Sequence, residues 1–142
     1  MNLPALLFSF QGRLNRAPYW LAGMGVIVAA VVLGNIALTI AGRHSAVAGV
    51  VAGLVFLLVV WGMLALTTKR LHDRDKSAWW LLLFYIVPSV LDAIGRLLGW
   101  VLILDPIGAA IGIWALIELG FLRGTKGPNN YGPDPLLAQA AA

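Results

Sequence analysis

The sequence predicts an all-α membrane protein, a polytopic bundle of four transmembrane helices. Two apolar runs, 19–41 and 46–68, contain no charged residue and are separated by only four positions. A helix of about 23 residues spans about 34 Å, which is enough to cross a bilayer core of about 30 Å. Of the 142 residues, 61% are hydrophobic and 11% are charged, against about 25% charged in an average soluble domain. This composition argues against an ordinary soluble enzyme.

The first two spans are bounded by residues that suit helix ends. Pro18 precedes the first span, 19–41, and favours a first helical turn. The span then opens with two aromatic residues, whose amphipathic rings favour the membrane–water boundary. Ser45 is a candidate N-cap for the second span, 46–68.

The third span has to include charged residues to be long enough. After the central polar loop, only 78–91 is apolar without interruption, so the expected span is 78–96. Asp92 and Arg96 are four residues apart, share a helix face and can pair near the far interface. Pro88 falls near the middle of this span, where we expect a kink and a freed backbone carbonyl.

The fourth span is predicted from an Asp-Pro dipeptide. Asp105 resembles an N-cap and Pro106 a first-turn proline, so this span is expected to cover 106–122. The preceding stretch, 97–104, is then an apolar connection in the interface.

The distribution of basic residues favours four spans with both termini cytoplasmic. Four spans place eight of the ten Lys and Arg residues on one side, in the N-terminal segment, the central loop and the tail. A three-span arrangement places six inside and three outside, and leaves Arg96 in the hydrocarbon. We therefore expect one integral membrane domain, 1–135, followed by a disordered tail, 136–142.

Small residues are expected to pack the helices. Gly49 with Gly53 and Gly108 with Gly112 form GxxxG pairs, which allow close approach of backbones. Packing within the chain is the expected use, and dimerisation through one of these faces is the alternative.

Few polar residues are expected near the membrane midplane, which is a weak scaffold for transport. Glu118 is the acidic residue expected to be submerged, together with the pair Asp92 and Arg96 as candidate buried ion pairs. Glu118 could bind a cationic ligand or exchange a proton, or it could be neutralised by Arg123 or by the basic loop.

No catalytic, cofactor or metal site is expected. His72 beside Asp73 invites a metal or acid–base interpretation, but a metal needs three or four ligands, and His44 is predicted across the membrane. The chain contains no cysteine, so disulfides, thiolate nucleophiles and cysteine-based metal sites are excluded.

Three polar segments resemble a known family. The blocks FSFQGRLNRAPYW at 8–20, TKRLHDRDKSAWW at 68–80 and GTKGPNNYGPDP at 124–135 occur in order between apolar spans. They resemble the domain-of-unknown-function 805 family, small bacterial inner-membrane proteins. The resemblance implies a helical bundle in the bacterial cytoplasmic membrane and assigns no activity, cofactor or substrate.

The same segments form a candidate cytoplasmic binding face. Its members are basic, amide or aromatic residues with one histidine and one aspartate: Arg13, Arg16, Lys69, Arg70, His72, Asp73, Arg74, Asn129, Asn130 and Tyr131. They could simply set topology and anchor the chain, or they could dock an anionic lipid headgroup or an acidic partner segment. The net charge of +4 does not indicate a nucleic-acid partner, because the basic residues cluster at the ends of apolar segments.

These observations favour a non-enzymatic membrane protein with a structural, regulatory or partner-docking role. A small-molecule or lipid carrier is the alternative, and it would need a polar cavity open to water. An enzyme would need its acidic and histidine side chains to cluster.

Overall fold

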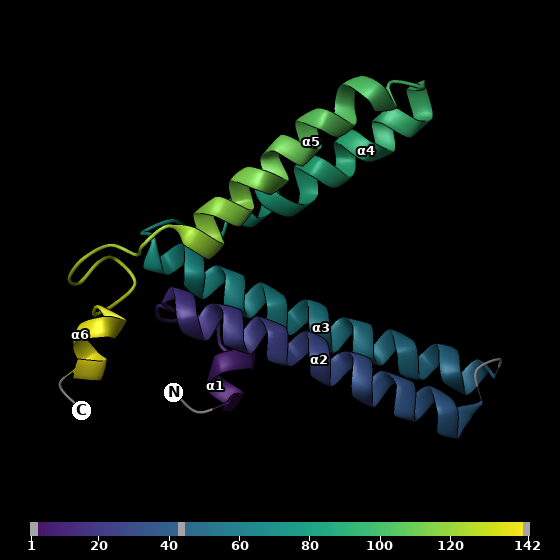
Figure 1. Ribbon diagram of the computed structural model, residues 1–142, viewed down its shortest axis with the longest axis horizontal. Coiled ribbons are helices and arrows are strands. Elements are labelled where there is room, and N and C mark those ends of the chain that lie inside the picture. Colours follow the sequence, from purple (N-terminus) through teal and green to yellow (C-terminus); the bar gives the residue numbers. More distant parts are fainter. Residues whose placement is uncertain (1–2, 43–44, 141–142) are drawn as a thin grey trace. The chain divides into compact units, whose positions relative to one another are not determined.

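The computed structural model describes residues 3–42 and 45–140, and all the regular elements within those ranges are helices (Figure 1). Contacts divide the chain into two compact units. The first unit contains 1–10 and 17–66, and the second contains 11–16 and 67–142. His44, predicted to lie across the membrane, falls outside the described residues.

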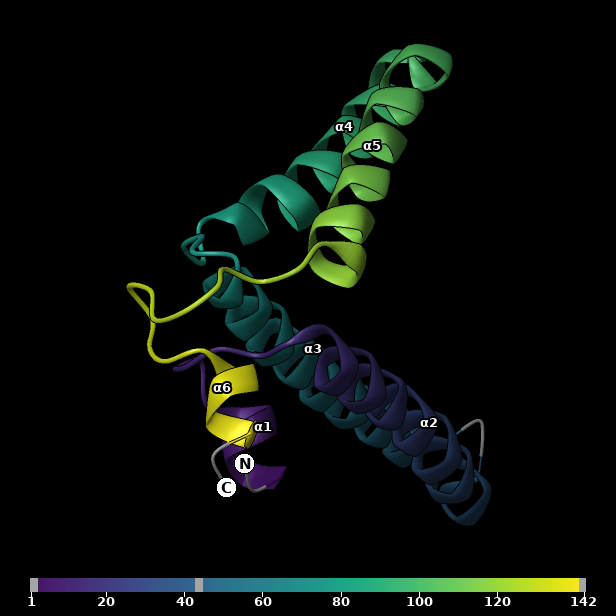
Figure 2. The same cartoon turned by 60° about the vertical axis from the view of Figure 1, so that its left-hand side comes forward.

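The first unit is a helical hairpin with a short additional helix. Helix α1 covers Leu3–Phe8, α2 covers Arg16–Ala41 and α3 covers Ala46–Asp73, and α2 and α3 run side by side (Figures 1 and 2). The first two predicted spans therefore lie within α2 and α3, which extend beyond them at the polar ends. The predicted cap at Ser45 is confirmed, because its Oγ accepts a hydrogen bond from the Ala48 N–H at 3.1 Å.

Glycines lie where α2 and α3 approach each other, but they are not the predicted ones. A β-carbon at each would lie 3.9 Å from a side chain of the facing helix: Gly23 from Met63, Gly34 from Val55 and Gly62 from Val26. By contrast, a β-carbon at Gly49 or Gly53 would meet no atom within 4 Å. The prediction that these two pack within the chain is wrong, because the pairing of the hairpin, and not the GxxxG spacing, decides which face is covered.

The second unit contains another antiparallel helical pair. It comprises two π-helical segments and three α-helices: η1 (Leu82–Ile86), α4 (Val87–Leu98), α5 (Val101–Leu116), η2 (Ile117–Phe121) and α6 (Pro135–Ala140). Helices α4 and α5 lie side by side in both views (Figures 1 and 2). A β-carbon at Gly108 would lie 3.6 Å from the Pro88 backbone, so this predicted packing glycine is used, whereas Gly112 meets nothing within 4 Å.

A wide helical turn precedes Pro88. Proline has no N–H and its ring collides with the preceding turn of a regular α-helix. The π segment η1 stands directly before α4, and Ser89 Oγ donates to the Tyr85 carbonyl at 2.8 Å. Regular helix geometry is thus interrupted where the sequence predicted it, through a π-helical turn.

The start of the last long helix differs from the prediction. Helix α5 begins at Val101, so Pro106 lies inside it and Asp105 is not an N-cap. The expected connection 97–104 is mostly helical. The reason is Gly99, whose left-handed conformation (φ 72°) ends α4 and lets the chain reverse within two residues.

Within residues 3–42 and 45–140, three helices are long and apolar enough to cross a membrane: Arg16–Ala41, Ala46–Asp73 and Val101–Phe121. The third predicted span corresponds to η1 and α4, and this stretch is not among the three.

The C-terminal end also differs from the prediction. Residues 136–140, expected to be disordered, belong to α6. Asp134 explains this helix, because its Oδ1 accepts the Leu136 N–H at 3.0 Å and Pro135 occupies the first helical position. Residues 141–142 lie outside the described part of the chain.

Candidate functional site: a buried arginine–aspartate network

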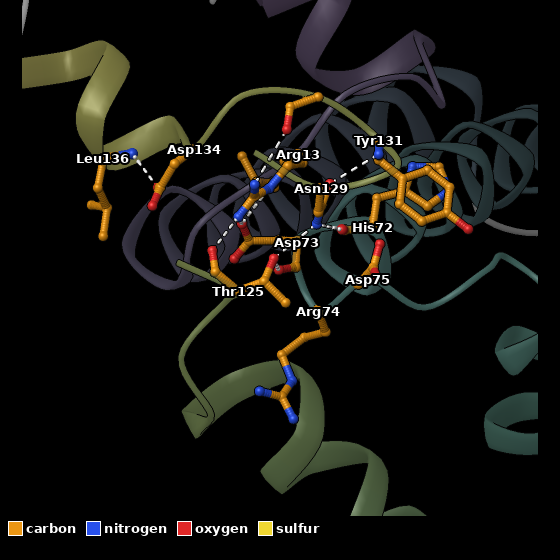
Figure 3. A network of polar contacts seen from close by, with 12 residues as sticks. Arg13, His72, Asp73, Arg74, Asp75, Thr125, Asn129, Tyr131, Asp134 and Leu136 are labelled. Carbon is orange, nitrogen blue, oxygen red and sulfur yellow. Dashed lines mark hydrogen bonds and ion pairs between the residues drawn. The ribbon is translucent and has the colours of Figure 1, made fainter. Parts of the chain in front are cut away.

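Asp73, the last residue of α3, holds two guanidinium groups. Arg13 Nε donates to Asp73 Oδ1 at 3.1 Å (Figure 3). Arg70 donates to Asp73 Oδ2. The side chains of Asp73, Arg13 and Arg70 are 3%, 1% and 0% exposed. We call Asp73, these two arginines and the backbone carbonyls that they bind the Asp73 network.

Backbone carbonyls of the C-terminal tail satisfy Arg13. Its guanidinium donates to the carbonyls of Thr125 and Gly127 at 2.6 Å each, and to that of Gly132 at 3.3 Å. Gly127 and Gly132 have positive φ angles, 75° and 134°. The glycines of the tail therefore let the backbone turn so that its oxygens converge on one cation.

Carbonyls near the end of η2 satisfy Arg70. Its Nε donates to Leu119 O at 2.7 Å, and another nitrogen donates to Leu122 O. The last carbonyls of a helix have no partner within the helix. Arg70 fills that deficit, and a weaker contact to Leu14 O at 3.4 Å adds the N-terminal segment.

The tail in turn caps the end of α3. The Thr125 N–H donates to the Asp73 carbonyl at 2.8 Å, and Asn129 Nδ2 donates to the His72 carbonyl at 2.8 Å. A β-carbon at Gly124 would fall on the Asp73 carboxylate, so only glycine fits there. Residues 12–14, 70–73 and 124–132, distant in sequence, thus form one polar cluster.

Glu118, in η2, is neutralised by the central loop. Its Oε1 lies 2.9 Å from Arg74 Nε and 3.8 Å from Lys76 Nζ, and the side chain is only 6% exposed. Arg74 also donates to the Arg123 carbonyl at 2.6 Å. Of the two sequence interpretations, neutralisation by the basic loop agrees with this geometry. Lys76 Nζ also lies 3.8 Å from the centre of the Trp80 ring, a cation–π contact.

His72 is held as a packing group. Its ring stacks on Tyr131 with 3.9 Å between centroids and 6° between planes, and Nδ1 lies 3.3 Å from the Gly12 carbonyl. Asn130 Nδ2 donates to Asp75 Oδ1 at 3.1 Å. Asp75 itself has a positive φ of 57°, so it turns the chain out of α3.

Asp134 is the other anchored carboxylate of the tail. Hydrogen bonds from the backbone N–H groups of Leu136 and Gly127 hold the pKa of this carboxyl below its usual range. The same two bonds connect the start of α6 to the turn that binds Arg13.

Asp92 and Arg96 form the predicted pair, with 2.8 Å between Arg96 Nη2 and Asp92 Oδ1, but it is not buried as predicted. The two side chains are 45% and 72% exposed, because the pair lies near the end of α4, beside the turn.

The sequence-predicted binding face therefore becomes largely an internal network. Arg13, Lys69, Arg70 and Asp73 are buried, and exposed Arg16 donates to the Phe121 carbonyl at 3.0 Å. Sequence reasoning missed Gly124, Thr125, Gly127, Asp75, Asp134 and Lys76 as members of the cluster. The many turn-forming residues of the tail were the sequence feature that could have indicated the backbone carbonyls that bind Arg13.

Two exposed cations remain beside the cluster. Within the described residues, the side chains of Arg123 and Lys126 are exposed and form no hydrogen bond or ion pair. In the same described ranges, no group of three or more His, Asp or Glu side chains could hold a metal ion.

Long apolar helices with polar clusters at their ends define a multi-pass, all-helical membrane protein. The chain belongs to the family described as "Protein of unknown function (DUF805)", whose model matches residues 7–133.

Its relatives in Escherichia coli strain K12 place it in the inner membrane. "Inner membrane protein YhaH" is 31% identical over 90% of this chain and 88% of the relative. "Inner membrane protein YhaI" is 32% identical over 89% and 85%, and "Uncharacterized protein YiiR" is 32% identical over 94% and 90%. No solved structure matches. The chain is therefore a multi-pass inner-membrane protein.

Proposed function

We propose that this protein crosses the inner membrane four times with both termini in the cytoplasm, and acts there as a non-enzymatic structural or docking protein. The pairing of α4 with α5 supports the additional crossing. Helical residues run from 80 to 98 when η1 is included, about 28 Å at 1.5 Å per residue. Helix α4 lies alongside α5 (Figure 2). If α5 spans the bilayer, α4 therefore lies at the same depth and crosses it as well.

The positive-inside rule supports the orientation. With four spans, eight of the ten Lys and Arg residues lie on the cytoplasmic side. The Asp73 network belongs to that side in this arrangement.

The single observation that carries the proposed role is the internal satisfaction of the buried charges. Asp73 pairs with both Arg13 and Arg70, backbone carbonyls also accept from both guanidinium groups, and Glu118 has two cationic partners. A catalytic carboxylate or histidine needs room for a substrate and a proton acceptor or donor. Groups that are already paired or stacked instead stabilise the polar cluster itself. Arg123 and Lys126 lie exposed beside this cluster.

We further propose that these two cations dock an anionic headgroup or an acidic segment of a partner. Headgroup attraction of surface lysines and arginines is worth about 1 kcal/mol each. Arg13 and Arg70, the residues that the sequence would have put in this role, are occupied by internal acceptors.

Cysteine labelling tests the topology, because the native chain contains no cysteine. In cells with a permeabilised outer membrane, a membrane-impermeant maleimide should label Leu97→Cys, at the end of α4. Lys126→Cys should react only after the inner membrane is broken. Labelling of both positions from outside, or of neither, would contradict four spans with a cytoplasmic C-terminus.

A charge-reversal pair tests docking. Purified Arg123→Glu/Lys126→Glu protein should lose the preference for phosphatidylglycerol over phosphatidylcholine that the native protein shows on lipid exchange in detergent. The charge-keeping control, Arg123→Lys/Lys126→Arg, should retain it. An unchanged preference in the glutamate variant would dispose of lipid docking at these residues, and capture of an acidic protein segment would then be tested with the same two variants.

A further inference from the structure

An apolar cavity lies within the first unit, between α1 and the hairpin of α2 and α3. Its volume is about 510 Å³, within the range of ligand pockets, about 300–1,000 Å³. Leu6 and Leu7 of α1, Ala29 of α2 and Val59 of α3 are among its lining residues. All the residues that line it have apolar side chains, so water and polar ligands would find few hydrogen-bond partners in it.

Small residues on α2 create the space. Gly25 and Ala29 are one turn apart and both line the cavity, and a β-carbon at Gly25 would meet no atom within 4 Å. Helix α1 is attached to α3 beside this gap. The Phe10 and Trp61 rings contact each other edge to face, 5.2 Å between centroids, and a β-carbon at Gly62 would lie 3.9 Å from Leu7. Helix α1 therefore covers the cavity without filling it.

We propose that this cavity holds an acyl chain of a phospholipid from the surrounding bilayer. The walls are continuous with the surface that α2 and α3 present to lipid. Leu21, Leu33 and Leu58 line the cavity and are also more than half exposed. Because both helices span the membrane, the medium at that opening is hydrocarbon chains.

The size of the cavity favours an acyl chain over a helix of a second protein copy. One turn of a helix about 10 Å wide occupies roughly 420 Å³. The cavity would thus hold little more than a single turn, whereas a flexible acyl chain can follow the gap between α1 and α2. The site depends only on α1, α2 and α3, so it stands whether or not α4 crosses the membrane.

Paired glycine variants test the proposal. Gly25→Leu fills the cavity, and Gly49→Leu adds the same side chain to α3 where a β-carbon likewise meets nothing within 4 Å. After purification in mild detergent and extensive washing, the native protein and Gly49→Leu should retain a phospholipid, measured by phosphate assay of the extract and by native mass spectrometry. Gly25→Leu should lose it.

A second cavity variant guards against misfolding of the first. Ala29→Leu should also lose the lipid while its circular dichroism and melting temperature match those of Gly49→Leu. Addition of dioleoyl phosphatidylethanolamine to delipidated native protein should restore the bound lipid. Equal retention in all variants, equal loss in Gly25→Leu and Gly49→Leu, or a second protein chain in place of the lipid would each overturn the proposal.

Discussion

Replacement of Asp73 by asparagine removes one negative charge from between two buried guanidinium groups. Arg13 and Arg70 would keep their carbonyl acceptors, Thr125 O and Leu119 O among them. Asparagine has nearly the shape of aspartate, so packing is preserved. What is lost is the counter-charge for two cations that are each 1% exposed or less.

The expected cost follows from the burial of the pair. Removing one partner of a buried ion pair typically costs about 3–5 kcal/mol, because it leaves an uncompensated buried charge. At about 2–4 °C per kcal/mol, as measured for soluble domains of similar or larger size, this corresponds to a fall in melting temperature of roughly 6–20 °C. Both arginines keep their hydrogen bonds to backbone carbonyls, so we expect a fall in melting temperature in the lower half of that range.

Thermal unfolding in detergent micelles measures this change, with Asp92→Asn as the matched control. Asp92 also pairs with an arginine, but that pair is exposed, and exposed ion pairs contribute little. Asp73→Asn should melt well below the native protein, and Asp92→Asn should melt close to it. Equal melting temperatures for the two variants would refute the assignment of a buried, charge-compensated network.

Three further outcomes follow from individual contacts. Gly124→Ala should destabilise the protein by about 1–3 kcal/mol, measured by thermal unfolding, since the methyl group would overlap the Asp73 carboxylate. Ser45→Ala should lose about 1 kcal/mol in the same assay through the missing helix cap. The hydrogen bond from the Leu136 N–H, and after it that from the Gly127 N–H, lowers the pKa of Asp134. The ionised carboxylate therefore stabilises the tail above about pH 4. This stabilisation should be lost, and the tail should become less protected from hydrogen exchange, as the pH falls through the folded-state pKa.

Each of these has a control. Gly112→Ala, on a helix face that meets nothing within 4 Å, should not lower the melting temperature and should raise it slightly, because alanine favours a helix over glycine. Native-like stability in Gly124→Ala or Ser45→Ala would show that the contact in question does not form. In Asp134→Asn, the protection of the tail, measured as its exchange rate relative to that of an unfolded peptide at the same pH, should not change between about pH 3 and 6. A persistent transition would assign the pH dependence to another carboxyl.

The Asp-Pro motif illustrates how a correct local rule can be applied to the wrong place. Asp105–Pro106 and Asp134–Pro135 both have the composition of a helix start. Only the second begins a helix, while α5 already begins at Val101. Gly99 decides the first case, because a left-handed turn there brings α5 back along α4 before the Asp-Pro pair is reached.

The basic residues illustrate a second limit. Positive charge at the ends of apolar spans is visible in the sequence, and in the structure Arg13 and Arg70 both pair with Asp73. Whether a guanidinium faces solvent or is buried depends on acceptors that carry no sequence signature, since every residue has a backbone carbonyl. Thr125 O and Leu119 O became arginine acceptors only because the chain folds back onto α3.

By itself, the sequence determined the membrane class, the two long apolar helices and the clustering of charge at their ends. These follow from local quantities, which are hydrophobicity summed over a helix length and charge counted in loops. The tertiary structure decided which glycines pack, where α5 begins, and that the Asp73 network compensates its charges internally. Such features require groups far apart in the chain to meet, and spacing along the sequence does not specify which of them do.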